Sequence, residues 1–313
     1  MTSTYTTHSG KTVTFDVVVD DILQNLSSED INPNNKALLS LVNDYEDGEW
    51  RRQKFEHFIW NNIKETALSQ TEKEALIGDE QTILTKSAKN LRLLEGEESG
   101  GEIGEILLYG IMKKYYSALP VVPKIFYKQN RQDFAKGADS IHITLNSDGT
   151  FSLWLGEAKF YNSIDDTRLN SIVGSVHNMF IKDKLRKELN IVTSIKDLEL
   201  FIKDENLLAQ IKHKLSDGIS LDEIKQQLHV PILILHECNI TKNNSGCYEE
   251  YKRKIEEEHI KKAETFMGKQ DKKFTDVYNY NEIKFHLILF PVPDKSILVD
   301  RFYKKAMFER DEN

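Results

Sequence analysis

The sequence predicts an α/β fold in which a mixed β-sheet is flanked by helices and preceded by a mainly helical N-terminal portion. Helical and strand patterns alternate along the chain, an order typical of a sheet covered by helices. Two β-rich segments, residues 138–145 and 151–160, are separated by Asn146-Ser147-Asp148-Gly149, which is typical of a hairpin turn. We therefore expect residues 1–94 to form the N-terminal portion. Residues 95–313 are expected to form the sheet-containing domain, with a helical insertion and a C-terminal helix.

The N-terminal portion is expected to begin with a strand and to continue as helices. Residues 11–20 alternate and are rich in β-branched side chains, which predicts a strand. Two asparagines stand before Lys36–Tyr45 and are suited to cap a helix there. Apolar residues between positions 50 and 59 recur near helical spacing, and a further helix is predicted over 80–94.

Gly100-Gly101 separates this portion from a strongly amphipathic helix predicted over residues 102–116. A short strand is expected over Ile125–Lys128, and the hairpin follows. The rest of the chain is predicted to contain, in order, a helix from about residue 165 to 189, two short helices within 194–228, a buried strand over 231–236, a charged helix over 248–267, a strand over 283–290 and a terminal helix from about 294.

Composition and charge restrict the classes of function. The net charge of −8 counts against a protein that coats nucleic acid by itself, because phosphate binding depends on Lys and Arg. An acidic metal pocket, or a partner that holds DNA, agrees with this charge. No apolar run approaches the ~20 residues of a membrane span, and no signal peptide is expected. The two cysteines, Cys238 and Cys247, form no metal-ligand set and agree with a reducing cytoplasm.

The second hairpin strand carries the residues that predict a site. Side chains two apart in a strand share a face, so Glu157 and Lys159 project together. Asp139 lies near the start of the preceding strand, and the two ends are neighbours in an antiparallel hairpin. Two carboxylates and an amine are therefore expected to converge.

Such a set has a use in phosphodiester hydrolysis. Asp139 and Glu157 supply the hard oxygen ligands that Mg²⁺ (or Mn²⁺) prefers. A bound divalent ion lowers the pKa of its water and polarises a phosphoryl oxygen. Lys159 is suited to orient the attacking water or to offset the charge that builds on the phosphate. The residues predict a metal-dependent nuclease site of the PD-(D/E)xK type, with Asp139, Glu157 and Lys159 as catalytic residues.

Two further acids lie on the helix that precedes the hairpin. Glu102 and Glu105 are one turn apart and share a face, so either is suited to add a third acidic ligand. Acidic residues in a first helical turn also favour the helix dipole without any catalysis, and this explanation is strongest for Glu102. Glu105 lies further along the helix and is the better candidate ligand.

A structural explanation competes with the proposed site, because Glu-x-Lys pairs are common on solvated strands, where they contribute little. Here the flanking residues are apolar: Leu153, Trp154 and Leu155 precede the pair, and Phe160 and Tyr161 follow it. Charged side chains in such a strand are costly unless something uses them, which favours the functional interpretation.

The segments GEIGEILLYGIM, KGADSIHIT and LWLGEAKFY resemble the HamA family, the nuclease subunits of the Hachiman anti-phage system. The resemblance covers most of the chain and is strongest from about residue 95 to 185. It implies a restriction-endonuclease-like fold, DNA degradation, and a complex with a superfamily 2 helicase, HamB, that senses DNA and restrains the nuclease. Asp139, Glu157 and Lys159 match the motif, and Glu102 or Glu105 matches its helix acid. Ala138 stands where the motif's name has proline, a position at which this superfamily does not require it.

The sequence therefore supports two hypotheses about function. The first is a Mg²⁺-dependent DNase that acts as the effector of phage defence with a helicase. The second is a non-catalytic subunit that keeps a nuclease-like fold to bind DNA or to dock a helicase. An intact Asp, Glu and Lys favours the first. A solitary restriction-type endonuclease ranks below both, because no sequence-recognition domain is visible.

Overall fold

The computed structural model describes residues 2–6, 12–16, 23–32, 35–94, 96, 99–130, 137–146, 148–194 and 196–311. Its strands are β1 Thr2–Thr6, β2 Thr12–Asp16, β3 Leu23–Asn32, β4 Lys36–Asn43, β5 Tyr45–Glu46, β6 Glu49–Trp50, β7 Leu119–Val122, β8 Ser140–Leu145, β9 Phe151–Tyr161, β10 Leu228–Glu237 and β11 Lys284–Val292. Its helices are α1 Arg52–Ala67, α2 Gln70–Ala75, α3 Glu80–Lys89, α4 Gly101–Tyr115, α5 Lys124–Asn130, α6 Asp166–Met179, α7 Lys182–Ser194, α8 Asp197–Phe201, α9 Glu205–Lys214, α10 Leu221–Lys225, α11 Asn239–Lys242, α12 Glu249–Lys273 and α13 Lys295–Asp311, with a 3₁₀ turn, η3, at Tyr280–Glu282.

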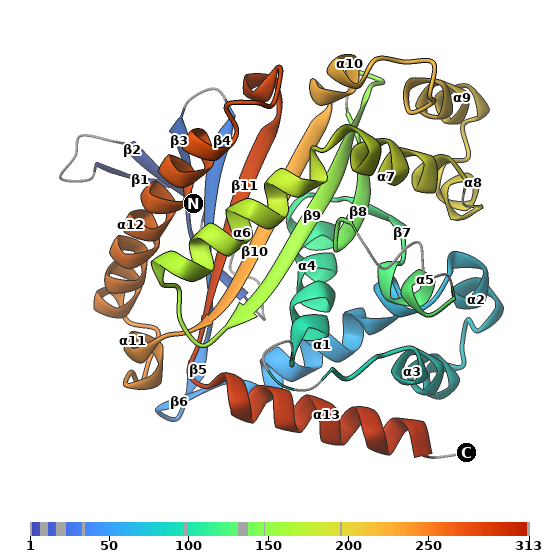
Figure 1. Ribbon diagram of the computed structural model, residues 1–313. Coiled ribbons are helices and arrows are strands. Elements are labelled where there is room, and N and C mark those ends of the chain that lie inside the picture. Colours follow the sequence, from blue (N-terminus) through green and yellow to red (C-terminus); the bar gives the residue numbers. More distant parts are fainter. Residues whose placement is uncertain are drawn as a thin grey trace.

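One mixed sheet forms the centre of the molecule (Figure 1). Its strand order is β1-β2-β3-β4-β11-β10-β9-β8-β7. The four strands β4, β11, β10 and β9 run parallel to one another, whereas β8 and β7 continue the sheet antiparallel. The prediction of a mixed sheet flanked by helices is thus confirmed.

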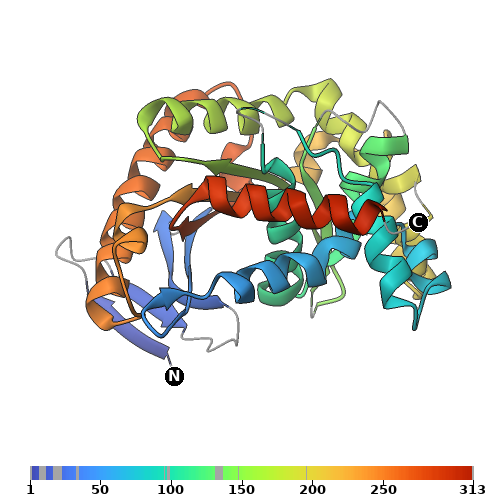
Figure 2. The ribbon, with the colours of Figure 1, turned by 90° about the horizontal axis from the view of Figure 1, so that it is seen from below.

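Helices cover both faces of the sheet, as Figure 2 shows with α6 and α1 on opposite sides of the strands. On one face, α6, α7 and α12 pack on residues such as Leu155, Ile232 and Leu287. On the other face, α1, α4 and α13 pack on residues such as Leu233 and Ile288. Successive residues of β10 and β11 are therefore buried on opposite faces, which explains why these strands are continuous apolar runs.

Several local predictions need correction. Lys36–Tyr45 was expected to be a helix, but Lys36–Asn43 is strand β4. The apolar run there is buried between β3 and β11. Hydrophobic periodicity cannot distinguish a strand from a helix in such a short apolar run. Ile125–Lys128 was expected to be a strand and lies in α5 instead. The single helix expected up to residue 189 is divided into α6 and α7, and three short helices, rather than two, occupy the insertion.

Other predicted elements are present. The helical part of the N-terminal portion is α1 to α3, which begins only after β4 to β6. Of the strand expected over 11–20, residues 12–16 form β2, and the others lie outside the described residues. The chain division at residue 94 stays a prediction, although β4 pairs directly with β11 in the same sheet. No helix of the described part is long and apolar enough to cross a membrane.

Helix α4 packs closely against β9 because small residues face each other at the contact. A Cβ atom placed on Gly104 would lie 3.6 Å from the Cβ of Ala158. On β9, a Cβ on Gly156 would lie 2.2 Å from Ser140 Oγ and 2.9 Å from Leu108 Cδ2, so a larger residue has no room there. This close packing brings the α4 carboxylates near the end of the hairpin.

Candidate functional site

The hairpin of β8 and β9 places the three predicted residues together. Ser140 pairs with Gly156, and the Asp139 backbone N–H donates to the Gly156 carbonyl at 2.7 Å. Asp139, one residue before β8, therefore lies beside Glu157. The register assumed from the sequence is correct, and Glu157 and Lys159 share the face of β9 that is covered by α6.

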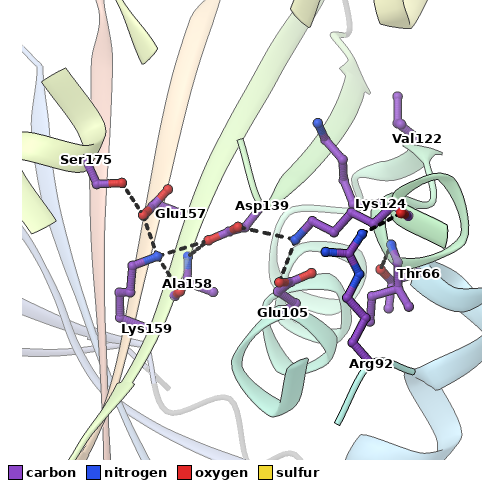
Figure 3. Close-up of polar contacts among 12 residues, drawn as sticks. Thr66, Arg92, Glu105, Val122, Lys124, Asp139, Glu157, Ala158, Lys159 and Ser175 are labelled. Atoms are coloured by element: carbon purple, nitrogen blue, oxygen red, sulfur yellow. Dashed lines mark hydrogen bonds and ion pairs between the residues drawn. The ribbon is translucent and has the colours of Figure 1, made fainter. Parts of the chain in front are cut away.

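The Lys159 ammonium group is surrounded by three oxygen atoms. Its Nζ lies 2.5 Å from Glu157 Oε1, 3.3 Å from Asp139 Oδ2 and 3.2 Å from the Ala158 carbonyl oxygen (Figure 3). The Ala158 N–H also donates to Asp139 Oδ2, at 3.1 Å. Two carboxylates and one carbonyl thus converge on a single cationic nitrogen.

Ser175, on α6, orients the glutamate of this group. Its hydroxyl donates to Glu157 Oε1 at 2.6 Å, and the Glu157 side chain is only 3% exposed (Figure 3). The sequence predicted the helix but gave no reason to single out Ser175, because contacts across elements leave no spacing pattern.

A second lysine, Lys128 on α5, extends the row of charges. Its ammonium group lies 2.7 Å from Glu105 Oε1 and 3.6 Å from Asp139 Oδ1. Three carboxylates and two ammonium groups therefore alternate in the order Glu105, Lys128, Asp139, Lys159, Glu157. The sequence pattern does not single out Lys128, because it predicts a strand, rather than helix α5, for the segment around this residue.

The two acids of α4 have different surroundings. Glu102 accepts hydrogen bonds from the backbone N–H groups of Arg92 (2.6 Å) and Leu93 (3.0 Å), so both of its oxygens hold the preceding loop. Glu105 bonds Lys128 through Oε1, while its buried Oε2 has no hydrogen-bond partner among the described residues. The structure therefore favours Glu105 over Glu102 as the helix acid of the site.

Burial and charge act against each other in this group. Burial raises the pKa of Glu105 to about 7, despite the opposing attraction of Lys128. Burial, and then the charge of Asp139, raise the pKa of Glu157. Burial also acts to raise the pKa of Asp139, but Lys159 and Lys128 outweigh it, and this pKa lies below its usual value. The two lysines remain cationic, because the carboxylates outweigh the effect of burial and raise the pKa of both ammonium groups.

The oxygens around Lys159 fit a divalent cation. Carboxylate and carbonyl oxygens are the ligands that Mg²⁺ prefers, and the ammonium group occupies the place among them that a cation takes. Among the described residues, no three His, Cys, Asp or Glu side chains are arranged to hold a metal ion by themselves, and in this site ammonium groups separate the carboxylates. Metal ligation by Asp139 and Glu157 stays a prediction.

A cavity of about 330 Å³ opens on the Glu105 side of the group. Residues from five segments line it, including Arg92, Glu102, Glu105, Lys128 and Asp139. Small molecules and water thus have space beside Asp139, whereas the Glu157 end is closed by α6.

The fold and the row of charges define an α/β protein with an acidic, lysine-bridged site at the end of a central hairpin. The HamA family model matches residues 16–306, which is nearly the whole chain. The chain belongs to the HamA family of Hachiman defence proteins, as the resemblance in its sequence indicated. No curated protein matches it in sequence.

The raised pKa of Glu105 predicts a pH-dependent stability. A folded-state pKa of about 7, above the ordinary 4.5, makes ionisation unfavourable in the folded state. The free energy of unfolding should therefore fall as pH rises from about 4.5 to about 7, by an amount on the order of 2 kcal/mol. Glu105→Gln should remove this part of the dependence. Urea unfolding at pH 5 and at pH 8 measures it.

The exposed Glu282 provides the control for this experiment. Glu282→Gln should keep the pH dependence of the wild type. Equal pH dependence in wild type and Glu105→Gln would show that burial does not penalise the Glu105 carboxylate.

Proposed function

We propose that the chain is a metal-dependent DNA nuclease that acts as the effector of a Hachiman defence system, in complex with a helicase. The observation that carries this proposal is the convergence of Asp139, Glu157 and the Ala158 carbonyl on one cationic position. A subunit that only binds DNA or docks a partner has no need of two buried carboxylates and a lysine in this arrangement, since burying them is costly.

Asp139, Glu157 and the Ala158 carbonyl would hold Mg²⁺ or Mn²⁺. When bound, such an ion lowers the pKa of its water and polarises the scissile phosphate. Hydrolysis would join a water oxygen to phosphorus and break the bond from phosphorus to the leaving sugar oxygen. Lys159 stands next to the metal ligands, where its ammonium group offsets the negative charge that develops on the phosphate. Ser175 keeps Glu157 Oε1 in position through its hydrogen bond.

The net charge of −8 supports a division of labour between two proteins. Phosphate binding by bulk electrostatics needs clustered Lys and Arg, which an acidic chain lacks overall. In the proposed complex, a superfamily 2 helicase of the HamB type captures DNA, and this chain cuts it.

Removal of either charged residue of β9 should stop DNA cutting without unfolding the protein. Glu157→Ala removes a metal ligand, and Lys159→Ala removes the cation beside the phosphate. We expect a loss of roughly a hundredfold or more in either variant. Plasmid cleavage with Mg²⁺, with Ca²⁺ and with EDTA measures it, in the presence and absence of the helicase. Cutting should need Mg²⁺, and Ca²⁺ should support little of it, because its looser geometry positions water poorly.

The matched control is an exposed acid–lysine pair on α12, Glu250 and Lys254, whose charged atoms are 2.7 Å apart. Alanine at either position should leave cutting unchanged. Retained cleavage in a folded Glu157→Ala or Lys159→Ala variant would remove the site assignment. Absence of cleavage by the wild type in every condition would favour the non-catalytic alternative.

Divalent metal should stabilise the folded protein. Metal binding relieves the repulsion between Asp139 and Glu157, and a ligand that binds only the folded state raises its stability by mass action. The melting temperature should rise by a few degrees in millimolar Mg²⁺ or Mn²⁺, and Asp139→Ala should abolish the rise. Asp217→Ala, at an exposed acid away from the hairpin, should keep it. An equal rise in both variants would place the metal elsewhere.

The chain should form a stable complex with the helicase encoded beside it. Co-expression followed by size-exclusion chromatography should give one co-eluting peak, because an acidic nuclease that binds DNA only weakly by itself gains from a partner that captures DNA. Two separate peaks at micromolar concentration would contradict this part of the proposal and leave the cutting activity open to its own test.

A further inference from the structure

A second cavity, of about 610 Å³, lies beyond Lys159 at the carboxyl end of β9. The end of β9, the first turn of α6 and the first turn of α13 meet there (Figures 1 and 2). Tyr161 and Arg168 line it from the first two elements, and Lys295 lines it from the third. None of these residues belongs to the row of charges around Asp139.

Arg168 is the unusual residue of this cavity. Its guanidinium group lies over the ring of Tyr161, 4.8 Å from the ring centre, and the side chain is half-buried. The guanidinium group forms no hydrogen bond or ion pair with any described residue. Arg186 and Arg301, by contrast, donate to backbone carbonyls and to a carboxylate. Arg168 thus keeps a full set of N–H donors for a ligand, while the stacking on Tyr161 restricts its orientation.

The remaining charged groups of the cavity suit an anion. The buried Lys295 ammonium group donates to the Phe160 carbonyl at 2.8 Å, which keeps its positive charge at the wall. Asp300 is the acid among the lining residues, and Lys304 pairs with it at 2.7 Å. A planar guanidinium fork with a neighbouring ammonium group matches the geometry of a phosphate.

The cavity lies further along β9 than the proposed cleavage centre, at a distance that a DNA strand can span. Lys159 and Tyr161 are two residues apart on one face of β9, so their side chains start about 6.6 Å apart along the strand. That is roughly the axial rise of two nucleotides of one DNA strand, at about 3.4 Å each. A DNA strand whose scissile phosphate lies beside Lys159 would therefore place a further phosphate near Arg168.

We propose that this cavity binds a phosphodiester of the cleaved DNA strand, two nucleotides away from the scissile one, with Arg168 as its ligand and Tyr161 as the platform that orients Arg168. The inference rests on the proposed nuclease function and deepens it, because it assigns the direction in which the substrate strand leaves the cleavage centre. The ligand is the nucleic-acid backbone rather than a base, so the contact is independent of sequence.

The test is binding of short fluorescent DNA oligonucleotides, single-stranded and duplex, to the full chain in EDTA, where no cutting occurs. The dissociation constant is measured over a series of salt concentrations. Arg168→Gln should weaken binding several-fold and reduce the slope of log K against log salt by about 0.7 for single strands or about 0.9 for duplex, the value of one phosphate contact. Arg168→Lys should keep most of the slope, because it keeps the charge.

The matched control is Arg253→Gln, at a half-exposed arginine that pairs with Glu257 on α12. It removes the same charge and should leave both affinity and slope unchanged. Melting curves of all variants exclude unfolding as the cause. In a cleavage assay with Mg²⁺, Arg168→Gln should raise KM several-fold and change kcat by less than about twofold, as expected for lost binding away from the reacting atoms.

The outcomes separate this inference from the function on which it rests. If Arg168→Gln gives the same salt slope and KM as Arg253→Gln while the wild type cuts DNA, the phosphate contact is absent and the nuclease proposal stands. If the wild type binds DNA but never cuts it, the nuclease proposal fails, and the change in slope still decides whether Arg168 contacts phosphate. If the wild type binds neither oligonucleotide, the inference is overturned.

Discussion

The ion pairs of one ammonium group, that of Lys159, hold the charged end of β9 together. Glu157 is almost fully buried in an interior strand, and Asp139 lies beside it. Without a cation between them, two carboxylates in this environment would repel each other and lose their hydration. The lysine and the Ala158 N–H supply the compensating interactions. The arrangement of the Asp139 and Glu157 carboxylates, and with it the chemistry of the site, depends on this compensation.

Helix α5 contributes a second ammonium group to the site, that of Lys128. A fully buried ion pair between Lys124 and Glu188, at 2.9 Å, ties the start of α5 to α7. The hydroxyl of Tyr109, on α4, donates to the Val122 carbonyl and accepts from the Lys124 N–H. Helix α5 is thereby fixed between layers, which brings Lys128 to both Glu105 and Asp139. Breaking a buried ion pair by removing one partner is strongly destabilising, so these contacts define the shape of the site as well as the stability of the fold.

The charges are distributed along β9 in a way that agrees with the proposed chemistry. Acidic oxygens gather where a cation is needed, at Asp139 and Glu157. Two residues further along, the wall of the larger cavity carries Arg168 and Lys295, where an anion is suited. The acidic group of the hairpin and the basic residues Arg168 of α6 and Lys295 of α13 thus follow one another along the direction of β9. This order matches the proposed substrate, since each phosphate of a DNA strand is an anion and the one that reacts would also contact the proposed metal.

The sequence alone determined the central hairpin and the convergence of Asp139, Glu157 and Lys159, because strand alternation and a turn of known type are local properties. It also determined the amphipathic helix α4 and the family. Tertiary structure decided the rest. Lys36–Asn43 forms a strand rather than a helix because it pairs with the edge of β11. An apolar run that is buried on both faces has no hydrophobic periodicity from which the sequence could predict this. The roles of Lys128, Ser175 and Arg168 depended on contacts between elements distant in the chain, which leave no local pattern. The choice between Glu102 and Glu105 likewise required knowing which carboxylate the backbone of Arg92 and Leu93 already engages.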